Sequence, residues 1–416
     1  MNKKKLHPAW LVLLGVILIR GFAGGGINMT SGLFLSPVST ELGIGIGNLS
    51  LYFSITSVVM VIWLPFAGKL INRYNIRIMA IIGAALQTFS FAAFGFMNNV
   101  YGWYFLAIPH AMGATILVNL LGPILINRWF AKNAGLMMGI QMAFVGLFGA
   151  VLQPLASNII AKNGWRYAYY FIGGVTFVVV VVASILFLRS HPKDYKLKAF
   201  GADEVKSPQN GAKSADTIQI SEKTAISSAS FYLILLFMIC ITGVGVFSQH
   251  IATYGSVLGY SLQQIGTGLA LASIGSAIGS ILIGFISDKI GGLKTCYGMI
   301  CVGILAVVGL MFSSTNFVIF YIATFLHGLI SSGIMVLAPI LTIIFYGQKD
   351  YEKIYAKVSM GAPLASILLI PVYGFIYDLT KSYLAVLVIL MVLLFVAVFS
   401  IALGWKKRCT ADGCPR

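Results

Sequence analysis

The feature that most constrains this chain is a succession of apolar segments, each long enough to cross a lipid bilayer. A spanning helix needs roughly 20 mostly apolar residues, and about twelve such segments follow one another here. Lipid offers backbone groups no hydrogen-bond partner, so these segments are predicted to be helices. With 59% hydrophobic and 9% charged residues, the chain is expected to be an all-α membrane protein rather than a water-soluble enzyme.

The predicted spans form two sets of six, separated by one long polar stretch. We expect an N-terminal half over residues 1–188, a flexible cytoplasmic linker over 189–229, a C-terminal half over 230–404 and a cytoplasmic tail over 405–416. The spans are placed at Ala9–Leu35, Leu49–Leu70, Ile78–Met97, Tyr101–Ile126, Ala134–Ala161, Trp165–Leu188, Ser230–Val257, Gln263–Ile286, Thr295–Phe312, Phe317–Phe345, Tyr355–Tyr377 and Tyr383–Gly404.

The distribution of Lys and Arg predicts the orientation, because these residues favour cytoplasmic loops. If the N-terminus is cytoplasmic, the outer loops hold only Lys162, Arg166 and Lys381 of the 28 basic residues. The first apolar segment is too long for a signal-peptide core and is expected to remain as the first span. We therefore predict a multi-pass protein of the cytoplasmic membrane with both termini inside, and the net charge of +17 is interpreted as this topology bias rather than as nucleic-acid binding.

An internal repeat relates the two predicted halves. Gly68 and Gly284, near the ends of the second and eighth spans, lie 216 positions apart, and so do Pro123 and Pro339. The repeat indicates a duplication. Parallel six-helix halves with a binding site near mid-bilayer are the architecture of rocking transporters.

The loop after the eighth span carries a Gly-x-x-x-Asp-x-x-Gly-x-x-Lys pattern, and with it the chain resembles the major facilitator superfamily. The resemblance implies twelve helices in two pseudo-symmetric halves and a role for this loop in conformational switching. The alternative interpretation of this loop is a tight basic turn between two helices. The first copy departs from the pattern at Asn72 and Asn75. The implied switch residues are Gly284, Asp288, Gly291 and Lys294, with Gly68 and Arg73 in the first copy.

Three further segments resemble the monocarboxylate porter and oxalate:formate antiporter group: residues 127–139, 164–166 and 373–378. That resemblance implies alternating-access transport, active or facilitative, of a small organic anion by a monomeric carrier. The cations that this group often carries in spans eight and eleven are missing, and Ser280 stands at the first of these places. A singly charged monocarboxylate is therefore favoured over a dianion.

Arg20 is the one charged residue placed deep in a predicted span, about 16 Å along the first helix at 1.5 Å per residue. Such a position costs at least about 2.5 to 3.5 kcal/mol, so the side chain should face the protein interior. Gly24 and Asn28 follow at i+4 and i+8 and extend a polar stripe. We expect Arg20 to bind the substrate anion. The alternative is an arginine satisfied by backbone carbonyls or extended toward the interface.

Other polar residues of the spans are weaker candidates for the same site, because packing explains each of them. A buried histidine is usually a neutral, hydrogen-bonded one, and glutamines often join helices. If transport is proton-linked, histidine titration is the expected route, since no carboxylate lies in a span core. Proton travel with the substrate itself, exchange with a counter-anion and facilitated diffusion are the alternatives. The candidate residues are His110, Gln141, Gln249, His250 and His327.

Three alternatives to an anion carrier are an enzyme, a multidrug exporter and a transporter-like sensor. The sequence shows no ATP-binding loop, buried acid pair or metal cluster, so neither an enzyme nor a cofactor or metal site is expected. Cys409 and Cys414 alone make no zinc site. A multidrug exporter usually needs a buried acid to bind cations and is the second choice. A transporter-like sensor that binds solute without moving it is the third.

Overall fold

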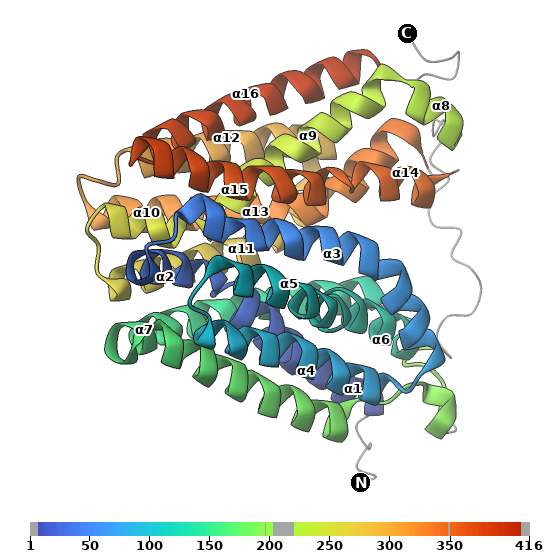
Figure 1. Ribbon diagram of the computed structural model, residues 1–416. Coiled ribbons are helices and arrows are strands. Elements are labelled where there is room, and N and C mark those ends of the chain that lie inside the picture. Colours follow the sequence, from blue (N-terminus) through green and yellow to red (C-terminus); the bar gives the residue numbers. More distant parts are fainter. Residues whose placement is uncertain (1–6, 196, 203–219, 348–349, 409–416) are drawn as a thin grey trace. The chain divides into compact units, whose positions relative to one another are not determined.

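The computed structural model describes residues 7–195, 197–202, 220–347 and 350–408 (Figure 1). Nearly all of these residues are helical, and the one β-bridge among them joins Phe130 and Phe200. The predicted basic start of the chain, residues 203–219 of the predicted linker and the Cys409/Cys414 tail lie outside the described residues.

The number of spans agrees with the prediction. Ten helices among the described residues are long and apolar enough to cross a membrane. One of them, Gly135–Phe187, contains two spans joined at Gly164, whose φ of 81° breaks the helix. A bent pair, Phe317–Gly333 and Leu337–Tyr346, supplies one more. The fold is therefore all-α with twelve spans, as predicted.

The chain divides into two compact units, one formed by residues 1–44 and 55–210, the other by residues 45–54 and 211–416. In the first unit, the long helix α7 turns back at Gly164 and packs beside α1 and α4 (Figure 1). Its elements are α1 (Pro8–Arg20), η1 (Gly21–Asn28), η2 (Ser31–Phe34), α2 (Leu35–Leu42), most of α3 (Ile46–Arg73), α4 (Ile76–Ala93), η3 (Phe94–Phe96), α5 (Val100–Ala114), η4 (Thr115–Leu120), α6 (Leu121–Trp129), α7 (Ala134–Phe187) and η5 (Pro192–Tyr195).

In the second unit, α13 packs against α11 and α12, and α9 lies beside α15 and α16 (Figure 1). The end of the predicted linker is ordered here: Ser221 caps a short helix, α8, and Glu222 forms an ion pair of 2.9 Å with Lys357 of α14. The elements are α8 (Glu222–Ser227), α9 (Ala229–Val246), η6 (Phe247–Gln249), α10 (Ile251–Val257), α11 (Leu262–Ile290), α12 (Gly292–Met311), α13 (Phe317–Tyr346), α14 (Tyr351–Val358), α15 (Gly361–Thr380) and α16 (Leu384–Lys406).

The eleventh span has its predicted extent, because Lys353–Thr380 is long and apolar enough to cross a membrane and contains the predicted Tyr355–Tyr377. Its helix is interrupted once: α14 ends at Val358 and α15 begins at Gly361. Pro363 explains the break, because proline has no N–H to bond the carbonyl four residues earlier, that of Ser359, and its ring clashes there.

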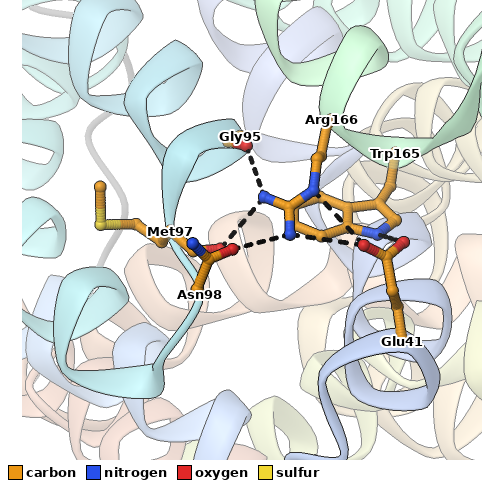
Figure 2. A network of polar contacts seen from close by, with 6 residues as sticks. All are labelled: Glu41, Gly95, Met97, Asn98, Trp165 and Arg166. Atoms are coloured by element: carbon orange, nitrogen blue, oxygen red, sulfur yellow. Dashed lines mark hydrogen bonds and ion pairs between the residues drawn. The ribbon is translucent and has the colours of Figure 1, made fainter.

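A polar network ties together three segments at one end of the first unit (Figure 2). The carboxylate of Glu41 accepts a hydrogen bond of 2.6 Å from the Trp165 indole and forms an ion pair of 3.3 Å with Arg166. Arg166 also donates to the Gly95 carbonyl at 2.9 Å and to Asn98 Oδ1 at 2.9 Å. The start of the sixth span is thereby fixed to the last turn of α2 and to η3 with the residues that follow it.

The first turns of α3 are fastened to α15 inside the second unit. Asp378 accepts hydrogen bonds from the backbone N–H groups of Ile46 at 2.9 Å and Gly47 at 2.7 Å, which have no partner within their own helix. A Cβ on Gly374 would lie 2.7 Å from the Gly47 Cα, so the two backbones approach without side chains between them. Ser54 donates at 2.6 Å to the Ile367 carbonyl, which Pro371 leaves without a helical donor.

We predict that Asp378→Ala destabilises the protein by about 0.5 to 2 kcal/mol, the usual cost of losing a helix N-terminal cap. Asp378→Asn should cost less, because one acceptor oxygen remains but the charge that favours a helix N-terminus is gone. The thermal midpoint of the purified protein measures both. Leu379→Ala is the matched control, since Leu379 is 85% exposed on the same helix end. Equal midpoints for Asp378→Ala and Leu379→Ala would contradict the prediction.

Candidate functional site

Arg20 is the last residue of α1, and the chain continues from it into the π-helix η1. Glycines allow this irregular turn to lie close to α7. A Cβ on Gly25 would lie 2.7 Å from the Val145 carbonyl oxygen and 2.8 Å from the Gly149 nitrogen, so the two backbones touch. A π-helical turn within a helix is often found at functional sites.

The Arg20 guanidinium is buried with most of its hydrogen-bonding capacity unused. The side chain is 3% exposed, and Nη2 donates to the Met142 sulfur at 3.4 Å, which is a weak acceptor. Within the described residues, neither Nε nor Nη1 has an acceptor. The expected alternative, in which backbone carbonyls satisfy the arginine, therefore has no support in these contacts.

Gln141 meets Arg20 at Gly122, so two of the predicted binding residues lie together. Gln141 belongs to α7, is 1% exposed, and its Oε1 has no donor among the described residues. A Cβ added to Gly122 of α6 would overlap Gln141 Oε1 and would lie 3.0 Å from Arg20 Cδ. Helices α1, α6 and α7 thus each contribute one residue to a small buried cluster, which we call the Arg20–Gln141 cluster.

Gly24 and Asn28, which were predicted to extend a polar stripe from Arg20, have neighbours outside the Arg20–Gln141 cluster. Asn28 accepts a hydrogen bond of 3.1 Å from Gln87 Nε2 of α4, and Gln87 also donates to the Ala23 carbonyl at 3.2 Å. A Cβ on Gly24 would contact the side chains of Val145 and Val118 at 3.2 and 3.5 Å. Gln87 was not predicted, because a lone glutamine in an apolar span gives no sign of its partners.

The three candidate histidines are buried, and each is bonded to a backbone carbonyl. His110 Nδ1 lies 3.3 Å from the Gln87 oxygen in the first unit. In the second unit, His327 Nε2 lies 2.9 Å from the Val244 oxygen and its Nδ1 3.5 Å from Ser331. His250 uses both nitrogens.

His250 Nε2 lies 2.8 Å from the Ile370 oxygen, and His250 Nδ1 lies 3.1 Å from the Tyr383 hydroxyl. Gln249, the residue before it, is half-buried at the end of η6. These contacts match the packing role that was the alternative for each histidine.

The predicted switch loop after the eighth span contains one position that needs glycine. Gly291 has a φ of 88° between α11 and α12, a conformation that other residues rarely adopt. Lys294 is exposed, a Cβ on Gly284 would meet nothing within 4 Å, and the Asp288 side chain lies outside the description.

The first copy of this loop is built differently. Asn75, which replaces the glycine, has an extended backbone and caps α4 by accepting from the Arg77 N–H at 2.9 Å. Asn72, which replaces the aspartate, accepts from Arg128 Nη2 at 2.8 Å. Arg73 is exposed, and a Cβ on Gly68 would meet nothing within 4 Å.

Comparison with known proteins gives one family. The family model described as Major Facilitator Superfamily matches residues 16–316 and 259–409. The chain is 21% identical over 361 residues to the uncharacterized MFS-type transporter YhjX of Escherichia coli, covering 86% of each chain. It is 22% identical to the oxalate:formate antiporter of Oxalobacter formigenes, covering 70% of this chain and 66% of that one. It is also 22% identical to monocarboxylate transporter 4 of Gallus gallus, covering 95% and 82%.

Solved structures resemble the chain over nearly its whole length. A bacterial homolog of the human lysosomal transporter Spinster, in an inward-facing and unoccupied conformation, matches with a TM-score of 0.70 at 14% identity, covering 99% of this chain and 100% of that one. The nucleoside transporter NupG matches with a TM-score of 0.68 at 12% identity, covering 96% and 98%. At these identities the likeness concerns the fold.

We predict that the three histidines contribute to stability in the order of their hydrogen bonds. His250→Phe should lower the thermal midpoint most, because it leaves two buried partners unsatisfied, at about 1 to 3 kcal/mol for such a group. His327→Phe should follow, and His110→Phe, with one 3.3 Å contact, should have the smallest effect. The reverse order would show that these contacts do not determine the stability.

Proposed function

The chain belongs to the Major Facilitator Superfamily, and from this premise we propose that it carries a small organic anion across the cytoplasmic membrane by alternating access, as a secondary active or facilitative transporter. The favoured substrate class is a monocarboxylate. The orientation follows from the charge distribution, which puts both termini in the cytoplasm.

The observation that carries this proposal is the unpaired Arg20 guanidinium. Among the described residues, Arg20 is the only charged side chain with an exposed fraction of a few per cent, at 3%. A buried cation is strongly destabilising unless an opposite charge and hydrogen-bond acceptors compensate it. Two of its nitrogens lack acceptors among the described residues. A carboxylate substrate supplies both the charge and the acceptor oxygens.

The single buried cation also favours a substrate with one negative charge over a substrate with two. A dianion would need a second cation near the first, and no other buried Lys or Arg occurs among the described residues. Relatives named as a monocarboxylate transporter and as an oxalate:formate antiporter fit an organic anion in general. The lone buried cation supports a monocarboxylate in particular.

We predict that Arg20→Ala weakens the binding of lactate by roughly tenfold to a hundredfold, the loss expected for a charge-assisted contact of about 1.5 to 3 kcal/mol. Arg20→Lys should also be impaired, because an ammonium cannot form the paired contacts of a guanidinium. The thermal midpoint of Arg20→Ala should be unchanged or higher, since an uncompensated buried charge is removed. Titration calorimetry and thermal unfolding, done on the same preparations, measure both quantities.

Lys162→Ala is the matched control, an exposed cation of the same unit. A stable Arg20→Ala protein with unchanged affinity would remove Arg20 from the site. A lower thermal midpoint with unchanged affinity would show a structural role. A screen in which lipophilic cations alone stabilise the wild-type protein would favour an exporter of cations and overturn the proposal. Uptake of labelled lactate into proteoliposomes separates a transporter from a sensor.

Energy coupling is proposed to proceed by exchange with a counter-anion or by proton linkage. If a pH gradient drives uptake, we predict that the triple variant His110→Gln, His250→Gln, His327→Gln loses that response while it retains exchange of substrate across the membrane. Flux measured with and without a pH gradient tests this. A full response in the triple variant would exclude the histidines as the proton route.

A further inference from the structure

The Arg20–Gln141 cluster contains unpaired groups of two opposite kinds. Nε and Nη1 of Arg20 are buried donors without acceptors, and Oε1 of Gln141 is a buried acceptor without a donor, as far as the described residues go. The two side chains meet at Gly122, whose missing Cβ leaves room for Gln141 Oε1 close to the Arg20 Cδ. A ligand that satisfies all of these atoms must bring acceptors for the guanidinium and a donor for the amide oxygen.

A carboxylate alone does not meet this requirement. Its oxygens accept hydrogen bonds from Arg20, but toward Gln141 Oε1 they present lone pairs, and two acceptors repel each other. The amide oxygen would then stay buried without a donor, which costs about 1 to 3 kcal/mol. A ligand that also satisfies Gln141 Oε1 must therefore carry a hydrogen-bond donor close to its carboxylate.

The chemistry of that donor is restricted. An ammonium group would place a second positive charge beside Arg20, and like charges repel strongly in a dry site. A 2-oxo group carries only acceptor lone pairs and would face the amide oxygen unfavourably. A hydroxyl is neutral and donates one hydrogen bond. Among small acids, a 2-hydroxy monocarboxylate fits both halves of the cluster.

We propose that Gln141 determines substrate specificity by accepting a hydrogen bond from the hydroxyl of a short 2-hydroxy monocarboxylate whose carboxylate is bound by Arg20. This inference rests on the proposed function, since it takes Arg20 as the carboxylate contact. Gln141 contributes selectivity between acids of equal size rather than the affinity that all carboxylates share.

The duplication supports a specialised cluster in the first unit. Ala338 stands 216 positions after Gly122 and carries the Cβ that Gly122 lacks. The positions 216 and 217 residues after Arg20 are Leu236 and Phe237, both apolar. The arginine and the glycine that accommodates its neighbour Gln141 thus occur together in the first copy alone.

A competing explanation is that Gln141 only positions Arg20, its Oε1 turning to accept from the guanidinium. The two explanations differ in a measurable way. A positioning residue affects every carboxylate alike, whereas a residue that binds the hydroxyl affects only ligands that have one. Lactate, pyruvate and propionate test this, because they have three carbons each and carry a hydroxyl, a carbonyl or a methylene next to the carboxylate.

The test is titration calorimetry of the full-length purified protein with each of the three acids. We expect the wild-type protein to bind lactate at least about tenfold more tightly than pyruvate or propionate, as expected when a buried polar group is left unpaired. Gln141→Met keeps the length and flexibility of the side chain but removes the acceptor. It should lower the affinity for lactate to the affinity for propionate. The affinity for propionate should stay within about twofold of the wild type.

The control variant is Gln153→Leu, which removes a buried glutamine of the same helix whose amide donates to the Met29 carbonyl at 2.8 Å. It should leave the preference for lactate intact even if the thermal midpoint falls. Should Gln141→Met fail to fold, Gln141→Asn, which withdraws the acceptor by one methylene, should lower the preference in the same direction.

Each other outcome has a separate meaning. Equal wild-type affinities for the three acids, all lost in Arg20→Ala, would overturn this inference and leave the proposed function standing. An equal loss for all three acids in Gln141→Met would show a positioning role and would also overturn it. If the wild type binds none of the three, the proposed function fails together with the inference.

Discussion

The free-energy cost of a guanidinium at the depth of a membrane span is the constraint on which the first unit depends. A residue that costs at least about 2.5 to 3.5 kcal/mol must be held away from lipid, and Arg20 is, with 3% of its side chain exposed. The surrounding backbone makes this possible. The π-helical turn after Arg20 lies against α7 through glycine, and Gly122 leaves open the space in which Gln141 reaches the arginine.

Elsewhere in the protein, polar side chains form hydrogen bonds with backbone groups. Proline and glycine interrupt several spans, and each interruption frees carbonyl or amide groups that lipid cannot satisfy. Ser54 donates to the carbonyl that Pro371 leaves open, and Asp378 accepts from the first amides of α3. The buried histidines bond to carbonyls of neighbouring helices. These contacts give each of these polar side chains a structural role.

The sequence predicted the spans well because hydropathy and length are direct consequences of the bilayer. It predicted that the Arg20 side chain faces the protein interior because a charge in an apolar segment is costly in contact with lipid. It could not predict what depends on tertiary contact. The adjacency of Arg20 and Gln141 arises from a glycine on a third helix, and the partner of Asp378 lies more than 300 residues away. The break at Pro363 was predictable from proline chemistry but was hidden by the continuous apolar pattern around it.

The sequence repeat predicts that the two halves arose by duplication, yet they do not carry the same chemistry. The loop after the eighth span keeps the glycine with positive φ at Gly291, whereas the first copy has a helix-capping asparagine, Asn75. Conversely, the first unit holds the buried arginine, and the positions equivalent to Arg20 and Gly122 in the second are apolar. A cation is costly enough in a span that a second one would require a second anion to offset it. A site for a singly charged ligand is therefore best built in one half alone, and divergence of this kind is what such a ligand would impose.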